Sequence, residues 1–429
     1  MVIPVKKHSI KGAALFVGNE VETAGYVHEY RDVGKIKFIV LRDWTGFIQI
    51  TVKKEEYSEF DSLDLNKEDV IFVKGKVIEN KVAPNGVEIH PSKILVLSKV
   101  KKKIPVDPTG KVKSELDTRL DYRYLDLRKK RVLNIFMVKS SLSNAFSSAS
   151  LKRGFVEIHP TTIVSAATEG GADVFPVQYF ENKVFLAQSP QLYKQIAIIG
   201  GMEKVFMKMH VFRAEKHNTA THLNEVFQMD VEAGFIDHIK AMDYLEGVFL
   251  DMLREIDSLE ETKEVNPEFE VPSSVNRYTY TEIVDLLNEN NVKIKWGEDF
   301  SKEQERKIYE ILQEDAFIIY EWPTLSRAFY SMPKQGEEEV CLAYDLMYKG
   351  LEVSSGAQRI HIPEILEEQL RKRNLNPADF DFYIEAFRYG APPHAGWSIG
   401  LERITMKALN LSNIREATLF PRDRTRIFP

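Results

Sequence analysis

The chain has 429 residues, of which 44% are hydrophobic and 28% charged, and this describes an ordinary soluble protein long enough for two or three domains. The sequence has no apolar run of membrane-spanning length, and its first residues lack the apolar core of a signal peptide. Cys341 is the only cysteine, which excludes intrachain disulfides and cysteine-rich metal sites and leads us to expect a reducing compartment, the cytoplasm.

The net charge of −6 is unevenly distributed along the chain. Residues 1–135 carry 26 Lys and Arg against 19 Asp and Glu, whereas the remaining residues carry 32 against 45. A basic N-terminal part joined to an acidic body suggests that the first part binds a polyanion.

Short apolar and β-branched runs, separated by turn signals, occupy residues 20–98. They predict five strands with one helix between the third and the fourth, which is the order of an OB-fold barrel, a frequent binder of single-stranded nucleic acid. The expected strands are 21–30, 35–41, 47–52, 70–77 and 87–96, and the expected helix is 53–65.

A charged segment with two prolines and a glycine, residues 99–110, follows the barrel and is typical of a hinge. We therefore expect three parts, with the barrel at 1–104, a hinge at 105–131 and a larger domain at 132–429.

Strands and helices alternate irregularly in the larger domain, which predicts an α+β fold around a mainly antiparallel sheet. An amphipathic helix is expected at 132–152, because apolar residues recur there at helical spacing and Gly154 can end it. The other expected helices are 117–131, 190–199, 239–256, 278–288, 363–372, 377–389 and 402–409, and the expected strands are 184–187, 205–212, 225–235, 343–352 and 397–400.

Three groups of charged residues are candidates for chemistry. Arg213 and Glu215 are two residues apart, on one face of an expected strand, and suit a ligand with a phosphate and a purine amino edge. Asp345 and Glu352 flank an expected turn and offer the hard oxygen ligands that Mg²⁺ prefers. Arg403 lies at an expected strand-to-helix junction.

These segments resemble motifs 2 and 3 of the class II aminoacyl-tRNA synthetases. The residues before Gly400 and the end from Phe420 to Pro429 resemble the aspartyl and asparaginyl branch, in subclass b. The run Gln188-Ser-Pro-Gln-Leu-Tyr-Lys-Gln195 resembles the aspartyl enzymes of that branch, and the chain as a whole resembles their archaeal type. The resemblance implies that Arg213 and Arg403 are catalytic, that Asp345, Glu352 and Ser355 hold Mg²⁺, and that ATP is bound by Arg213, Glu215, His222, Leu223, Glu352 and Arg403.

The amino-acid pocket is expected around Lys194 and Arg359. Gln191 and Lys194 are three apart on an expected helix and face one pocket. Two cations in a small pocket call for a carboxylate side chain, since a neutral amide would leave them uncompensated. By resemblance, Gln191 and Asp230 take the ammonium group, and the residues that bind L-aspartate are Glu169, Gln191, Lys194, Asp230, Ser355 and Arg359.

In the barrel, the resemblance assigns four residues to the tRNA anticodon: Arg31, Phe38, Gln49 and Glu88. An exposed aromatic ring can stack on a base, and an amide can read a base edge. His28 and Pro84 resemble the residues found in family members that discriminate tRNA(Asp) from tRNA(Asn).

The function implied by the resemblance is ATP-dependent activation of L-aspartate and its transfer to tRNA(Asp) by a homodimer. The alternatives are an asparaginyl-tRNA ligase and a catalytically inactive tRNA-binding paralogue. Two departures from the family pattern stand out. Pro160 comes one place early in motif 1, which faces the partner subunit, and Val226 stands where some relatives stack a phenylalanine on adenine, with Phe227 expected to face away.

Overall fold

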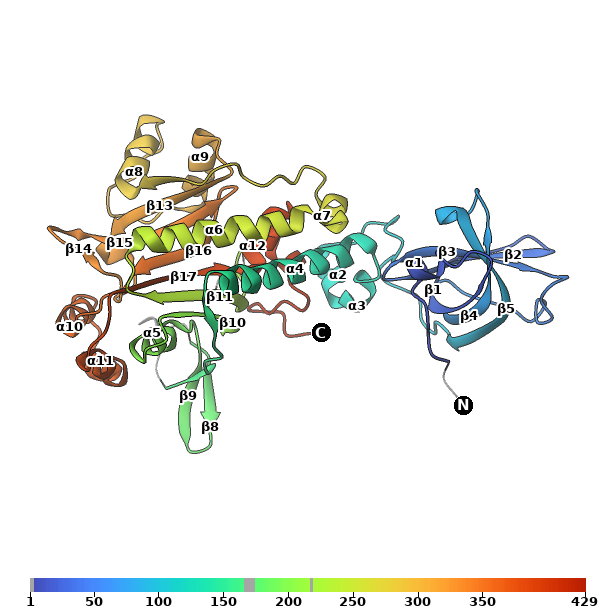
Figure 1. Ribbon diagram of the computed structural model, residues 1–429, viewed down its shortest axis with the longest axis horizontal. Helices are drawn as coiled ribbons and strands as arrows, with labels where there is room; N and C mark the ends of the chain where they lie inside the picture. The colour runs from blue at the N-terminus through green and yellow to red at the C-terminus, as the bar shows by residue number, and fades with distance from the viewer. Residues whose placement is uncertain (1–3, 166–173, 217–218) are drawn as a thin grey trace. The chain divides into compact units, whose positions relative to one another are not determined.

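The computed structural model describes residues 4–165, 174–216 and 219–429 and divides into two compact units, Met1–Leu133 and Asn134–Pro429 (Figure 1). The boundary lies close to the expected end of the hinge, and the three-part division remains a proposal. Within the described ranges, no helix is both long and apolar enough to cross a bilayer.

The first unit contains a closed five-stranded barrel in the order β1-β2-β3-β5-β4. A short helix, α1 (Ile10–Ala13), precedes it. Apolar side chains at alternate positions of the strands fill its interior, and the expected five-strand barrel is confirmed. The strands are β1 (Glu20–Asp32), β2 (Ile36–Asp43), β3 (Gly46–Lys53), β4 (Val70–Glu79) and β5 (Val87–Ser98).

The helix expected at 53–65 was wrong, because this segment forms a series of turns. The buried Lys37 donates from Nζ to the carbonyl oxygens of Phe60 and Leu63, each at 2.7 Å. Those carbonyls thus bond to a side chain instead of to a helix backbone. The segment still contributes its apolar side chains to the barrel core.

The single helix expected at 117–131, within the expected hinge, was wrong, because this stretch forms two short helices, α2 (Leu116–Asp121) and α3 (Arg123–Asp126), which belong to the first unit. Tyr122 separates them with φ −112° and ψ 41°, outside the helical region.

The second unit is built on a nine-stranded, mostly antiparallel sheet in the order β12-β13-β15-β16-β17-β11-β10-β6, with β14 paired to β15 (Figure 1). The first and last pairs of this order are parallel. Its strands are β6 (Val156–Glu157), β10 (Lys204–Phe212), β11 (Glu225–Gly234), β12 (Asn276–Thr279), β13 (Ala316–Pro323), β14 (Pro333–Lys334), β15 (Glu337–Tyr348), β16 (Leu351–Gln358) and β17 (His394–Gly400). A small separate sheet has the order β7-β9-β8, with β7 (Ile163–Val164), β8 (Pro176–Tyr179) and β9 (Asn182–Leu186).

Two long helices, α4 (Lys130–Lys152) and α6 (His238–Asp257), pack their apolar sides against the sheet and contribute to its main core. A second core joins α5 (Gln191–Ile199), α10 (Pro363–Lys372) and α11 (Asp381–Arg388). The remaining helices are α7 (Glu260–Val265), α8 (Tyr280–Glu289), α9 (Lys302–Leu312) and α12 (Leu401–Ala408).

The expected strand 343–352 is in fact the end of β15, a turn and the start of β16. Lys349 and Gly350 both have positive φ, 47° and 72°, and form the turn expected between the two carboxylates. Asp345 and Ser355 are consequently cross-strand partners in the β15–β16 hairpin.

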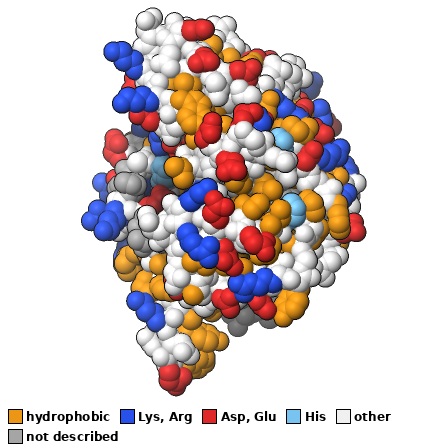
Figure 2. Space-filling view, turned by 90° about the vertical axis from the view of Figure 1, so that its left-hand side faces the viewer, with side chains coloured by type: hydrophobic (Ala, Val, Ile, Leu, Met, Phe, Trp, Pro, Cys, Tyr) orange, Lys and Arg blue, Asp and Glu red, His pale blue; other side chains and the backbone are white. Residues whose placement is uncertain are grey.

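On the face of the second unit drawn in Figure 2, basic and acidic side chains are interspersed, with small hydrophobic groups between them. This face therefore offers no large basic field for a polyanion.

Candidate active site

A pocket with a volume of about 120 Å³ opens where β11, β16 and β17 meet the start of α12. Its lining combines two arginines, three carboxylates and three serines, which are groups that suit a phosphorylated, metal-bound ligand. The structure brings together here seven residues expected from the sequence: Arg213, Glu215, His222, Leu223, Glu352, Ser355 and Arg403.

Arg213 and Glu215 lie just beyond the end of β10, so their expected place on a strand was wrong. Asn224 holds this segment instead, because its Nδ2 donates to the carbonyl oxygens of Arg213 at 2.7 Å and Glu215 at 3.0 Å. Nε of Arg213 is buried and has no hydrogen-bond partner among the described residues. A buried, unpaired guanidinium N–H facing a pocket is prepared for an anionic ligand.

Arg403 projects from the first turn of α12 toward the turn between β15 and β16. Its Nη1 donates to the carbonyl oxygen of Glu352 at 3.0 Å and lies 3.6 Å from the carboxylate of the same residue. Gly400 ends β17 directly before this helix. The two arginines of the pocket thus come from segments almost 200 residues apart in the chain.

Asp345, Glu352 and Ser355 fit a divalent cation. Asp345 is only 2% exposed, and Oδ1 accepts no hydrogen bond of ordinary geometry from the described residues, although the hydroxyl of Ser355 faces the carboxylate. Arg327 reaches Oδ2 at 2.5 Å. Burial first, and then the neighbouring charge of Glu352, raise the pKa of Asp345 to about 7.

A cation between these carboxylates would relieve that repulsion. In the described part of the chain, no group of three or more His, Cys, Asp or Glu side chains could hold a metal ion. Ligand phosphate oxygens and water would therefore complete the coordination, as is usual for Mg²⁺.

Helix α9 places two charged residues beside the pocket that the sequence did not reveal. Nζ of Lys302 lies 3.1 Å from Nδ1 of His222 and also contacts Thr221. Burial, followed by the charge of Glu352, raises the pKa of Glu305 to about 7. Neither residue belongs to a recognisable motif, so only the tertiary fold could place them here.

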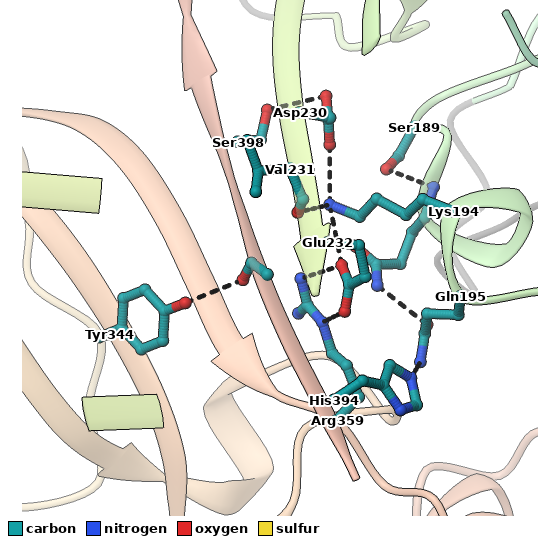
Figure 3. Close-up of polar contacts among 12 residues, drawn as sticks. Ser189, Lys194, Gln195, Asp230, Val231, Glu232, Tyr344, Arg359, His394 and Ser398 are labelled. Atoms are coloured by element: carbon teal, nitrogen blue, oxygen red, sulfur yellow. Dashed lines mark hydrogen bonds and ion pairs between the residues drawn. The ribbon is translucent and has the colours of Figure 1, made fainter. Parts of the chain in front are cut away.

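Beside this pocket, a buried cluster of charges joins α5, β11 and Arg359, the residue directly after β16 (Figure 3). Lys194 is 1% exposed, and its Nζ lies 2.9 Å from Oδ1 of Asp230 and 3.4 Å from Oε2 of Glu232. Arg359, 3% exposed, donates from Nε to Oε1 of Glu232 at 3.0 Å. Ser398, opposite Asp230 on β17, donates to Oδ2 of Asp230 at 3.1 Å.

Glu232 is the residue of this cluster that sequence reasoning missed. It follows Asp230 by two residues on β11 and so shares its face of the sheet, a spacing that could have identified it. Burial raises the pKa of a carboxyl, but the cations of Arg359 and Lys194 outweigh it and leave the pKa of Glu232 below its ordinary value.

The expectation that Lys194 and Arg359 are left uncompensated without a ligand was wrong, because Asp230 and Glu232 already balance their charge. Gln191, 3% exposed, lies one turn before Lys194 on α5, as expected. Glu169 falls outside the described residues.

The barrel residues expected at the anticodon lie on one face of the first unit. Phe38 is the cross-strand partner of Arg31 and of Thr51, while Gln49 is the partner of Glu88. Gln49 and Thr51 donate to Oε2 of Glu88 at 2.9 and 2.6 Å. Phe38 is half-buried and Arg31 largely exposed, so both are accessible to a ligand.

His28 and Pro84 lie around Phe47 of the same barrel. The ring of His28 packs edge-on against Phe47, and its Nδ1 lies 3.0 Å from Nη1 of Arg42. Asn85, next to Pro84, donates to the carbonyl oxygen of Phe47 at 2.7 Å.

Val226 and Phe227 point to opposite sides of β11, as expected. Val226 lines the pocket that contains Arg213 and Arg403, whereas Phe227 lines a second pocket between α4 and the C-terminal segment. Phe227 packs there against His210, at 4.9 Å between ring centroids.

Two family models match the chain. The model described as tRNA synthetases class II (D, K and N) matches residues 115–424, and the model of the OB-fold nucleic acid binding domain matches residues 21–97.

Relatives of known activity match almost the whole chain. An aspartate–tRNA(Asp/Asn) ligase of Methanocaldococcus jannaschii is 46% identical over 96% of this chain and 95% of its own length. An aspartate–tRNA(Asp) ligase of Pyrococcus abyssi is also 46% identical, over 96% of this chain and 97% of its own. Among solved structures, the asparaginyl-tRNA synthetase of Pyrococcus horikoshii with asparaginyl-adenylate superposes with a TM-score of 0.92 at 31% identity, over the full length of both chains.

Proposed function

The chain belongs to the class II tRNA synthetases of the aspartate, lysine and asparagine group and is an aspartate–tRNA ligase, and on this premise we propose how its residues divide the reaction. An enzyme of this kind binds ATP, its amino acid and tRNA. The observation that carries the choice of aspartate is the buried cluster of Lys194 and Arg359 around Glu232.

Counting charges in this pocket with the adenylate bound, in which the α-carboxylate of the amino acid is joined to phosphate and no longer charged, explains the preference for aspartate. Lys194 and Arg359 are balanced by Asp230 and Glu232 in the free protein. The α-ammonium group of the substrate, which we assign to Asp230 and Gln191, adds one positive charge. A side-chain carboxylate restores neutrality in this buried site, whereas the amide of asparagine would leave an unpaired charge there.

In the adjacent pocket, we assign the nucleotide to Arg213, Arg403 and Glu215. The aspartate α-carboxylate oxygen attacks the α-phosphorus, the bond to pyrophosphate breaks, and aspartyl-adenylate forms. Arg213, whose buried Nε has no hydrogen-bond partner in the part of the chain that the structure describes, and Arg403 would stabilise the charge that grows on the phosphate oxygens. Glu215 would accept a hydrogen bond from the adenine amino group, and His222 and Leu223 line the same pocket.

We propose that Asp345, Glu352 and Ser355 hold Mg²⁺ together with the phosphates of ATP. When bound, the metal ion would neutralise phosphate charge and keep ATP bent. The raised pKa of Asp345 supports this assignment, as does its Oδ1, which accepts no hydrogen bond of ordinary geometry from the described residues.

In the second step, a ribose hydroxyl at the 3′ end of tRNA attacks the aspartyl carbonyl carbon and AMP leaves. No protein nucleophile is required, because the adenylate is already activated. Binding and orientation therefore account for the protein's part in this step.

We assign the anticodon to the barrel face formed by Arg31, Phe38, Gln49 and Glu88. The half-buried ring of Phe38 can stack on a base, and Gln49, oriented by Glu88, can read a base edge. The basic charge of the first 135 residues favours the same partner.

We propose that both tRNA(Asp) and tRNA(Asn) are charged. Their anticodons differ only in the third base, cytosine or uracil, and a site separates such bases by hydrogen bonds to their edges. Pro84 has no side-chain hydrogen-bonding group, and Nδ1 of His28 is engaged with Arg42. The Methanocaldococcus jannaschii relative carries both tRNAs in its name. This proposal differs from the discriminating type expected from the sequence.

We propose a cytoplasmic homodimer. The second pocket, between α4 and the C-terminal segment, has half-exposed apolar residues at its margin, among them Leu419 and Phe420, which a second copy could cover. Sedimentation of the purified chain at twice its monomer mass would support this assembly, and a monomeric mass would exclude it.

Amino-acid-dependent exchange of pyrophosphate into ATP tests the proposed roles. Exchange should depend on aspartate, and exchange supported by asparagine alone would overturn the amino-acid assignment. Charging assays with purified tRNA(Asp) and tRNA(Asn) then test the tRNA proposal, which fails if tRNA(Asn) stays uncharged.

A further inference from the structure

A chain of buried hydrogen bonds runs from β17 and α11 into the amino-acid pocket. His394, Gln195 and Tyr383 are each fully buried, and none of them belongs to the residues assigned to ligands above. The chain continues to Gln191, which lies one helical turn before Gln195 on α5. Figure 3 shows Gln195 between the ring of His394 and the charge cluster around Glu232.

The first link fixes the protonation state of His394. Its Nδ1 lies 2.8 Å from the carbonyl oxygen of Pro392, which can only accept, so Nδ1 carries the proton. Burial, despite the nearby charge of Glu232, lowers the pKa of His394 and keeps the ring neutral. Nε2 of the neutral ring is therefore an acceptor.

The second link fixes the amide of Gln195. Its Nε2 lies 2.9 Å from Nε2 of His394 and must be the donor, since the ring nitrogen accepts. The oxygen Oε1 then faces the opposite way and accepts from the hydroxyl of Tyr383 at 2.9 Å. A flipped amide would place two acceptors, Oε1 and the ring nitrogen, against each other.

The third link reaches the substrate pocket. Nε2 of Gln191 donates to Oε1 of Gln195 at 2.9 Å, which completes the two acceptor positions of that oxygen. With its nitrogen tied in this way, Gln191 keeps its own Oε1 for another donor, and no described residue donates to it. An amide oxygen suits an ammonium group, whereas an amide nitrogen would repel it.

We propose that Gln195, held by His394 and Tyr383, is a positioning residue that orients the Gln191 amide with its oxygen toward the α-ammonium group of aspartate. The inference rests on the proposed function, specifically on the assignment of the ammonium group to Gln191 and Asp230. It adds a positioning role to residues that otherwise pack as ordinary core of α5 and α11.

The test compares two tyrosine hydroxyls. Tyr383→Phe removes the hydroxyl that bonds Gln195, and Tyr344→Phe removes an equally buried hydroxyl that donates to the carbonyl oxygen of Gly396 at 3.1 Å. In pyrophosphate exchange, Tyr383→Phe should raise the KM for aspartate about three- to tenfold, the effect of one hydrogen bond, and leave the KM for ATP unchanged. Tyr344→Phe should change neither KM.

A double-mutant cycle with Gln191→Ala separates positioning from general destabilisation. In the Gln191→Ala background, Tyr383→Phe should have no further effect on the KM for aspartate, because the group it orients is gone. Independent, multiplying effects, or equal changes in the aspartate and ATP values, would overturn the inference.

Two further variants keep the outcome decisive. Gln195→Met retains chain length without the amide and should raise the KM for aspartate at least as much as Tyr383→Phe, so it serves if the tyrosine variant does not fold. If Gln191→Ala itself leaves the KM for aspartate unchanged, the ammonium assignment of the proposed function fails. If Gln191→Ala raises it and the other variants do not, the positioning inference alone fails.

Discussion

The guanidinium of Arg359 donates two hydrogen bonds to the carboxylate of Glu232, from Nε at 3.0 Å and from Nη2 at 3.3 Å. Such a paired geometry fixes the direction of both side chains. Lys194 reaches the same carboxylate from α5 at 3.4 Å. Glu232 therefore holds the two cations of the aspartate pocket at a set spacing before any substrate arrives.

Replacing the lysine of this cluster should affect aspartate and not ATP. In Lys194→Met, the buried charges of Asp230 and Glu232 lose a partner, and the side-chain carboxylate of aspartate loses its cation. We expect kcat/KM for aspartate in pyrophosphate exchange to fall about 100-fold or more, because removing one partner of a buried ion pair leaves the other charge buried and unpaired. The KM for ATP should stay near its original value.

Lys240→Met, on the exposed side of α6, serves as the control and should leave both parameters unchanged. Parallel loss of aspartate and ATP affinity in Lys194→Met would contradict the assignment of Lys194 to the amino acid.

Removing a carboxylate from the expected metal site should weaken metal-dependent ATP binding. Calorimetry should measure the factor by which Mg²⁺ increases the affinity for ATP. In Glu352→Gln, we expect this factor to be at least about tenfold smaller, since losing even a residue that only hydrogen-bonds a metal ligand lowers metal affinity this much. Binding of ATP without metal should not weaken, because the substitution removes a negative charge near the phosphates. Glu337→Gln, at the exposed start of β15, is the matched control.

The same loss of ATP affinity with and without metal would mean that Glu352 contacts the nucleotide directly and does not hold Mg²⁺. The side chain of Arg403 donates to the backbone carbonyl oxygen of Glu352, and Glu352→Gln retains this hydrogen bond. The substitution therefore changes only the side-chain carboxylate.

Glu88 should make the stability of the barrel depend on acid pH. Burial opposes ionisation, but hydrogen bonds from Thr51, His90, Asn80 and Gln49 lower the pKa of Glu88 from 4.5 to about 2. A folded-state pKa below the unfolded one stabilises the fold above pH 4.5, and this contribution is lost as the pH falls toward 2. Glu88→Gln should lower the melting temperature at pH 7, and its difference from the original chain should shrink at pH 3.

The control for this comparison is Glu79→Gln, an exposed position at the end of β4. It should match the original chain at both pH values. A difference for Glu88→Gln that is constant between pH 7 and pH 3 would show that ionisation of Glu88 does not contribute.

The spacing of apolar residues along the sequence predicted the barrel and most helices and strands of the second unit, because this spacing is regular in them. The failures have specific physical causes. The segment 53–65 has helical spacing, but the ammonium group of Lys37 takes its carbonyl oxygens. Arg213 and Glu215 continue a strand pattern, but Asn224 ends the strand there by bonding both carbonyls.

The site was predictable to the extent that its motifs are contiguous. Gln191 and Lys194 share a helix, and Asp345 and Ser355 meet across a short hairpin, so local spacing brings each pair together. Glu305 on α9 comes near Glu352 only through the tertiary fold, and no local spacing relates the two residues.

The division of labour between the two units can be tested with Phe38→Ala. Phe38 is half-buried on the barrel face, between Arg31 and Thr51 on the neighbouring strands, where a base could stack on its ring. Loss of one such stacking contact costs about 1–3 kcal/mol, which corresponds to about 5- to 150-fold in kcat/KM for tRNA charging. Pyrophosphate exchange without tRNA should be unchanged, because it needs only ATP and aspartate. Val96→Ala, a partly exposed position on β5, should leave both activities intact. If Phe38→Ala lowered exchange and charging equally, the ring would serve the fold of the chain and not the anticodon.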